Sequence, residues 1–203
     1  MSAPLRAAGL REDPEMSAYP AELEERATLL DGSEIFLRPL RPEDGPLLQD
    51  LLDHMSQEDR RLRFFAPIRR LSARLVRQLT EIDYAHAIAL LAFAADGATL
   101  LGVVRLAAEP PTLRDRGSLG DPADSTRAEF AVALRSDWKG HGLGWLLMHR
   151  MLGLATRLGV AEVFGYVLRE NERMLDMCRE MGFAAAPAPG NPEVVLVRRT
   201  VAG

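Results

Sequence analysis

A glycine-rich run at residues 139–144, KGHGLG, has the composition of a turn that binds an anion through its main chain. Glycine leaves backbone N–H groups open to a phosphate, because no Cβ blocks the approach. Apolar residues recur at helical spacing from Leu143 to Leu158, so the run precedes a helix. Free N–H groups and the positive end of the helix dipole favour negative charge there. The sequence therefore predicts a phosphate-binding turn, although it matches neither the Walker pattern nor the dinucleotide fingerprint.

A carboxylate, Glu129, stands in the segment that leads into this turn. Phe130, Val132 and Leu134 alternate with Glu129 and two alanines, which is the period of a β-strand. The alanines on the face of Glu129 leave space above the sheet. Glu129 can therefore accept a proton from a substrate, or it can pair with an arginine such as Arg127 or Arg105.

The rest of the chain predicts an α/β protein, a mixed sheet of about seven strands with helices on both faces. The expected strands are residues 27–30, 35–37, 87–94, 100–107, 129–134, 161–168 and 193–201. Helices are expected around residues 47–55, after the N-cap candidates Ser56 and Ser72, over residues 143–158, and after Asn171. A loop is expected at residues 184–191.

Two segments carry no such periodicity. Residues 1–26 are polar and acidic with three prolines, so we expect a disordered extension before a single domain at residues 27–203. Residues 108–126 are rich in proline, glycine and charge, which is typical of a mobile or functional loop.

Composition restricts the class of protein. The net charge of −4 gives no general attraction to nucleic acid. No apolar run approaches the roughly 20 residues that span a bilayer, and the N-terminus has no signal-peptide core. The single cysteine, Cys178, agrees with a reducing compartment. We therefore expect a cytoplasmic protein without membrane or nucleic-acid partners.

The turn and its surroundings resemble a known family. Lys139, Gly142 and Gly144 match [R/Q]-x-x-G-x-[G/A] except for the lysine, and Asn171 and Met174 precede Met181-Gly182-Phe183. This combination resembles the GNAT superfamily of acyl-CoA N-acyltransferases, and it implies the GNAT fold and acetyl-CoA as co-substrate, with no metal. Lysine keeps the charge of arginine but loses its planar fork.

A narrower resemblance rests on residues 56–65, SQEDRRLRFF, and 79–84, LTEIDY. These runs are similar to the acetyltransferase domain of bacterial protein lysine acetyltransferases that modify acyl-CoA synthetases. Many such proteins also carry a synthetase-like or cyclic-nucleotide-binding domain, which this sequence does not include. We expect Arg60, Arg61 and Arg63 to meet an acidic partner surface, with Phe64 and Phe65 nearby or in the core.

The resemblance also assigns roles to residues. The pantetheine arm would pair with the backbone of Val132, Ala133 and Leu134. The pyrophosphate would bind the turn formed by Lys139, Gly140, His141, Gly142, Leu143, Gly144 and Trp145. Asn171 would contact the CoA arm, cap its helix, or do both. Glu129 would be the general base, since a lysine ammonium with a pKa near about 10.4 must lose a proton.

Two further side chains have alternative interpretations. Cys178 stands where many members of the superfamily have a tyrosine, so it is either a general acid or a small core residue. His141 could reach a phosphate or remain solvated.

Three functions follow. The first is an acetyl-CoA-dependent acetyltransferase acting on a protein lysine, with an acyl-CoA synthetase as acceptor. The second is a small-molecule amine acetyltransferase on the same fold. The third is a non-catalytic CoA-binding module, which the presence of Glu129 disfavours.

Overall fold

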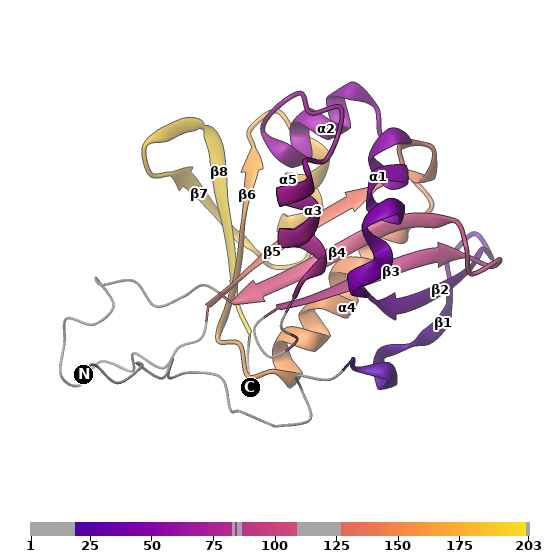
Figure 1. Ribbon diagram of the computed structural model, residues 1–203. Coiled ribbons are helices and arrows are strands. Elements are labelled where there is room, and N and C mark those ends of the chain that lie inside the picture. The colour runs from indigo at the N-terminus through magenta and orange to yellow at the C-terminus, as the bar shows by residue number, and fades with distance from the viewer. Residues whose placement is uncertain (1–18, 83, 85–86, 109–126, 202–203) are drawn as a thin grey trace, which may run out of the picture.

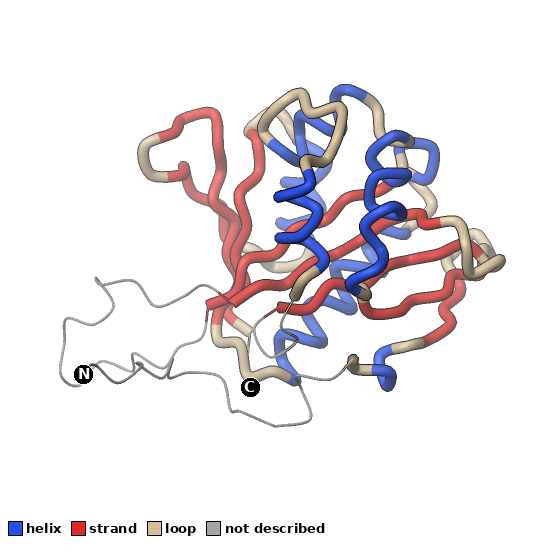
Figure 2. Tube along the Cα trace, viewed as in Figure 1, coloured by secondary structure: helices blue, strands red, loops and turns tan. Residues whose placement is uncertain are grey.

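The computed structural model describes residues 19–82, 84, 87–108 and 127–201. Its centre is one sheet of eight strands in the order β1-β2-β3-β4-β5-β6-β8-β7 (Figures 1 and 2). Only β5 and β6 run parallel, and the other neighbours are antiparallel. The strands are β1 Glu25–Thr28, β2 Glu34–Pro39, β3 Ala87–Ala94, β4 Leu100–Ala108, β5 Arg127–Leu134, β6 Glu162–Leu168, β7 Ala184–Ala188 and β8 Asn191–Thr200.

Helices cover both faces of this sheet, as the sequence predicts. One face carries α1 Gly45–Asp53, α2 Gln57–Phe64 and α3 Ala73–Thr80, and the other carries α4 Leu143–Arg157 and α5 Glu172–Glu180 (Figure 1). Strand alternation divides the core accordingly. Leu91 of β3 packs with α1 residues, whereas its neighbour Leu90 packs with α4 residues. The mixed α/β architecture is therefore confirmed.

Local signals in the sequence account for several element boundaries. The Ser56 hydroxyl accepts a hydrogen bond from the backbone N–H of Asp59 at 3.0 Å, and Ser72 caps α3 in the same way. Such caps satisfy N–H groups that the helix cannot pair internally. Gly32, at φ 86°, forms the turn between β1 and β2, a conformation that glycine adopts without strain.

Two expectations about the chain ends need correction. Residues 184–191 do not form a loop, because β7 pairs antiparallel with β8 and adds an eighth strand. Its exposed alanines gave no apolar alternation to indicate a strand. The N-terminal boundary is also too late. Tyr19 packs edge-on against Tyr84 at 6.2 Å, and β1 begins at Glu25. Residues 19–26 therefore belong to the fold, and residues 1–18 lie outside the described part.

The parallel pair β5–β6 opens into a gap. Backbone pairing joins Arg127–Glu129 to Glu162–Phe164 and goes no further. β5 continues to Leu134 beside β4, while β6 turns to pair with β8 (Figure 1). The edge of β5 that faces β6 therefore leaves N–H and C=O groups without a strand partner from Phe130 onward. α2 contacts both strands at this gap.

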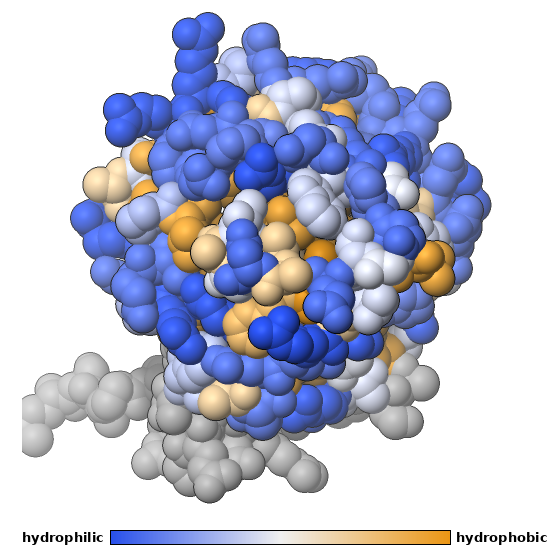
Figure 3. Space-filling view, turned by 90° about the vertical axis from the view of Figure 1, so that its right-hand side faces the viewer, coloured by the Kyte–Doolittle hydropathy of each residue, from blue (hydrophilic) through white to orange (hydrophobic). Residues whose placement is uncertain are grey.

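The described helices and one face of the surface show how apolar residues are distributed. Among the described helices, none is long and apolar enough to cross a bilayer. Figure 3 views the molecule from the right-hand side of Figure 1, and hydrophilic residues dominate this face, with small apolar patches between them.

Candidate active site

A cavity of about 500 Å³ occupies the gap between β5 and β6. Its walls come from α2, from β5 and β6, from the glycine-rich turn before α4, and from α5. This volume lies within the range of about 300–1,000 Å³ that is typical of small-ligand sites. Most of the residues that the sequence assigns to a cofactor line it: Val132, Ala133, Leu134, Lys139, Gly140, Gly142, Gly144, Trp145 and Asn171. Glu129 lines the same cavity.

The glycine-rich turn presents free main-chain donors to this cavity. Gly142 has φ 86° and serves as the N-cap of α4, and no side chain there accepts a hydrogen bond from the helix. The first N–H groups of a helix have no internal acceptor. A left-handed backbone and an uncapped helix start therefore leave these donors available to an anion.

A second positively charged side chain lies beside this turn, and the sequence alone did not predict it. Arg173, in the first turn of α5, lines the cavity. Its Nη2 atom lies 3.7 Å from the place where a Cβ on Gly140 would stand. The side chain forms no ion pair with another described residue and faces the turn. Arg173 stands two residues after Asn171, the N-cap of α5. This position in the sequence could have indicated that its side chain lies beside the glycine-rich turn.

Lys139 does not project freely into the cavity. Its ammonium forms an ion pair with Asp59 of α2, and the Ser136 hydroxyl donates a hydrogen bond to the same carboxylate. Ser136 also accepts a hydrogen bond from the backbone N–H of Ser56 at 2.7 Å. Lys139 thus ties α2 to the turn, and its contact with a phosphate stays a prediction.

The Asp59 carboxylate is charged in this network. Burial by itself raises the pKa of Asp59, but hydrogen bonds from Lys139, Ser136 and Ser56 outweigh burial and lower that pKa below its usual value. The side chain of Asp59 is only 8% exposed. An ionised carboxylate that is this buried needs its cation.

Asn171 caps α5. Its side-chain oxygen accepts a hydrogen bond from the backbone N–H of Met174 at 3.3 Å, so the capping interpretation is confirmed. The residue also lines the cavity. The amide nitrogen remains available as a donor, and a contact with the CoA arm stays a prediction.

Glu129 is not held by either arginine that the sequence offered as a partner. Arg127 pairs instead with Glu162, with 2.8 Å between Nε and Oε1, and its guanidinium stacks on Phe164. Arg105 forms no ion pair with Glu129. The carboxylate of Glu129 is exposed in the cavity and has no hydrogen bond to any residue in the described ranges.

Three candidate residues do not line the cavity. Cys178 is 1% exposed in the core, and burial raises the pKa of its thiol to about 12. Leu143 is also 1% exposed and packs in the core. His141 is exposed, and its Nδ1 atom lies 2.6 Å from the Asp31 carboxylate in the β1–β2 turn. The structure therefore favours the core interpretation of Cys178.

The basic run on α2 is not the open surface that the sequence suggested. Arg60 donates hydrogen bonds to the backbone carbonyls of Met55 and Asp53, and Arg61 pairs with Glu170. Arg63 turns inward and lines the cavity. The expected acidic docking through these arginines therefore needs correction. Of the loop expected at residues 108–126, residues 109–126 lie outside the described part of the chain.

Three exposed aromatic side chains, called the aromatic rim below, line the cavity. Phe65, Trp145 and Tyr166 are 45%, 36% and 44% exposed, and all three line it. Phe65 has φ 57°, the one non-glycine residue with positive φ in the described part of the chain. Large apolar side chains gathered at one opening mark a site where another molecule docks. Within the same described part, no group of three His, Cys, Asp or Glu side chains could hold a metal ion.

Comparison with known proteins agrees with this geometry. An acetyltransferase of Pseudomonas aeruginosa is 28% identical over 173 residues, which cover 84% of this chain and 86% of that protein. The acetyltransferase Pat of Mycolicibacterium smegmatis is 26% identical over 151 residues, 74% of this chain. These residues span only 41% of the length of Pat.

A solved structure and a family model extend the comparison. The GNAT domain of PAT from S. lividans superposes with a TM-score of 0.77 at 26% identity, covering 90% of this chain and 99% of that domain. The family model described as an acetyltransferase (GNAT) domain matches residues 34–184, which include the whole cavity. The chain belongs to the GNAT acetyltransferase family.

Proposed function

We propose that this protein transfers the acetyl group of acetyl-CoA to a lysine of another protein, with an acyl-CoA synthetase as the acceptor, and that Glu129 is the general base. One observation carries the proposal. A single cavity joins an uncapped helix start, an unpaired strand edge and the Glu129 carboxylate, which no described residue holds by a hydrogen bond. These are the groups needed for a phosphate, a pantetheine amide and an acceptor amine.

The cofactor would lie along the gap. Its pyrophosphate would accept hydrogen bonds from the N–H groups after Gly142, and Arg173 would add charge beside the turn. The pantetheine would then pair with the free edge of β5 between Val132 and Leu134, as an added strand does. This order brings the thioester to the middle of β5, close to Glu129.

The chemical step would be a direct transfer. A neutral amine attacks the thioester carbonyl, a C–N bond forms, the C–S bond breaks, and CoA leaves as a thiolate. Glu129 accepts the amine proton, directly or through water, because a lysine ammonium is not nucleophilic. The thiolate takes a proton from solvent, since Cys178 is buried away from the cavity.

A protein acceptor is supported by the aromatic rim and by similarity to PAT and Pat. Phe65, Trp145 and Tyr166 would pack around the acceptor lysine on a partner surface.

A thiol-release assay with acetyl-CoA tests the proposal against acyl-CoA synthetases, polyamines and aminoglycosides. We expect turnover with a synthetase, with the acetylated lysine located by mass spectrometry. Faster turnover with a free amine than with every protein would instead assign a small-molecule acetyltransferase. Acetyl-CoA binding without turnover on any acceptor would leave a CoA-binding module.

A further inference from the structure

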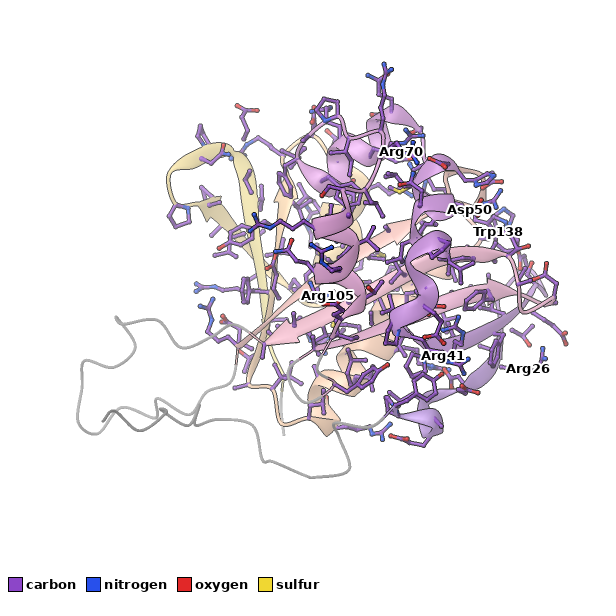
Figure 4. The ribbon with its side chains drawn as sticks, in the orientation of Figure 1. Arg26, Arg41, Asp50, Arg70, Arg105 and Trp138 are labelled. Carbon is purple, nitrogen blue, oxygen red and sulfur yellow. The ribbon has the colours of Figure 1, made fainter. Side chains whose placement is uncertain are left out.

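Two arginines, Arg63 and Arg105, stand near Glu129, and neither forms an ion pair with a described residue. The guanidinium of Arg63 lies over the Phe64 ring, 4.9 Å from its centroid. Arg63 lies on α2 and lines the cavity. Arg105 stands on β4, on the sheet face covered by α1, α2 and α3 (Figure 4). Arg105 lies opposite Ala131 in the β4–β5 register, one alternate position from Glu129. The side chains of Arg105 and Glu129 therefore share one face of the sheet, the face covered by α2, which carries Arg63.

Each of the two arginines has one buried donor that lacks a hydrogen bond. The Nε atoms of Arg63 and Arg105 are inaccessible to solvent and have no hydrogen-bond partner. Neither side chain forms an ion pair with any residue that the structure describes. Buried arginines are normally paired, because a guanidinium has five donors and cannot lose its charge easily.

The charges of the three groups act on one another. Burial lowers the pKa of Arg63, the charge of Glu129 raises it, and the charge of Arg105 lowers it again. Burial also lowers the pKa of Arg105, and Glu129 opposes that shift. Two positive charges and one negative charge therefore leave a net positive charge around Arg63, Arg105 and Glu129. An anion bound there would neutralise this charge.

The two arginines lie beside the cavity that Glu129 lines. Arg63 lines the main cavity together with Glu129, and it also lines a smaller cavity of about 50 Å³ beneath it. Arg105 lines the smaller cavity beside Ala131 and Ala133. Arg63 thus borders both spaces, together with Met55, Ala131 and Ala133. A small planar anion held between the two spaces would lie near both guanidinium groups.

We propose that Arg63 and Arg105 form a subsite for a carboxylate carried by one of the two substrates that meet at Glu129. Arginine is suited to this task because its fork matches the two oxygens of a carboxylate. The inference rests on the proposed acyl transfer. Either substrate can supply the carboxylate: the acyl group, as in succinyl-CoA, or an acidic residue next to the acceptor lysine.

Free succinate tests the subsite without any CoA. We expect succinate to raise the melting temperature of the full chain, and uncharged succinamide to leave it unchanged. Arg63→Gln and Arg105→Gln should each remove the effect. Arg70→Gln, at an exposed arginine outside the cavity, should keep it (Figure 4). Arg105→Lys keeps the positive charge but lacks the planar fork, so succinate should raise its melting temperature by less. This variant keeps the subsite testable if a glutamine variant folds poorly.

Two further arms identify the source of the carboxylate. Calorimetry compares succinyl-CoA with acetyl-CoA, and kinetics compare lysine peptides flanked by glutamate with matched glutamine peptides. We expect a preference of about 10- to 100-fold for the carboxylate in one arm, lost in Arg63→Gln and Arg105→Gln, since hydrogen bonds to charged groups are worth this much. Acetyl-CoA affinity should be the same in all variants.

The outcomes separate the two proposals. Failure of acetyl-CoA to bind the wild-type protein would contradict the proposed function, while the succinate result would still decide the subsite. Normal acetyl-CoA binding with no succinate effect and no carboxylate preference in either arm would overturn the subsite alone. A carboxylate preference that survives both glutamine variants would also overturn it.

Discussion

Asp59 of α2 and Lys139 of the glycine-rich turn form an ion pair although 80 residues separate them in the sequence. The pair joins the helix that covers the cavity to the turn proposed to hold the pyrophosphate. Ser136, just before the turn, reinforces the contact. Helix α2 and the glycine-rich turn are therefore connected by one network of charge and hydrogen bonds.

Removal of Lys139 should destabilise the protein. In Lys139→Ala the carboxylate of Asp59, 8% exposed, loses its cation while it stays buried. We expect a loss of about 1–3 kcal/mol in the free energy of unfolding, measured by urea denaturation. Arg179→Ala is the control, because its pair with Asp176 is exposed on both sides and should contribute little. Equal stability of the two variants would contradict this role for Lys139.

The same network predicts a response to acid. Because the pKa of Asp59 is lower in the folded protein than in the unfolded chain, its contribution to stability is complete above the ordinary pKa of an aspartate, about 3.9. That contribution is lost as the pH falls through the lower, folded pKa. Asp59→Asn lacks the carboxylate, so its stability should fall less steeply below about pH 4 than that of the wild type. Asp53→Asn, exposed on α1, should follow the wild type.

Local sequence patterns predicted much of the fold, because they report on short-range physics. The Ser56 and Ser72 caps, the Gly32 turn and the alternation along β5 each depend on neighbours within a few residues. Strand β7 escaped prediction because its stability comes from pairing with β8 rather than from its own apolar residues.

The residues of the site were predictable where they form a continuous motif in the sequence. Prediction failed where the arrangement depends on contacts between residues far apart in the sequence. The glycine-rich turn and Glu129 stood out from the spacing of their neighbours, and the structure brings them to one cavity. Their roles come from the family resemblance. The partner of Lys139, the inward turn of Arg63 and the approach of Arg173 to Gly140 all depend on how separate elements pack. A sequence offers several charges as partners for each such residue, and only packing decides among them.

A carboxylate in the glycine-rich turn should abolish cofactor binding. Gly142→Asp strains a backbone with φ 86° and places negative charge where the pyrophosphate is proposed to bind. We expect no measurable heat with acetyl-CoA in calorimetry. Gly153→Asp makes the same change in the exposed middle of α4, where no atom stands within 4 Å of a new Cβ, and it should bind normally. Unchanged affinity in Gly142→Asp would remove the turn from the site.

Loss of the proposed base should slow the chemical step without affecting the cofactor. Glu129→Gln keeps the size of the side chain and cannot accept a proton at neutral pH. We expect kcat to fall by about 10²–10⁴-fold while the Kd for acetyl-CoA stays the same. Glu193→Gln, on the exposed start of β8, is the matched control. Near-normal turnover by Glu129→Gln would show that another group or water takes the proton.

The aromatic rim should matter for a protein acceptor and not for a small one. Phe65 is 45% exposed at the cavity mouth and has φ 57°, a conformation that asparagine accepts more easily than phenylalanine. Phe65→Asn should therefore keep the fold while it removes the apolar contact. If the ring becomes buried against a partner, the loss of about 1.5–3 kcal/mol predicts an increase in KM for the protein substrate of roughly 10- to 100-fold.

Leu30→Asn, at a fully exposed leucine in the β1–β2 turn, should leave that KM unchanged. With a free polyamine as acceptor, Phe65→Asn should match the wild type. An unchanged KM for every protein substrate would mean that Phe65 lies outside the docking surface, and the small-molecule reaction would then be the better account of this site.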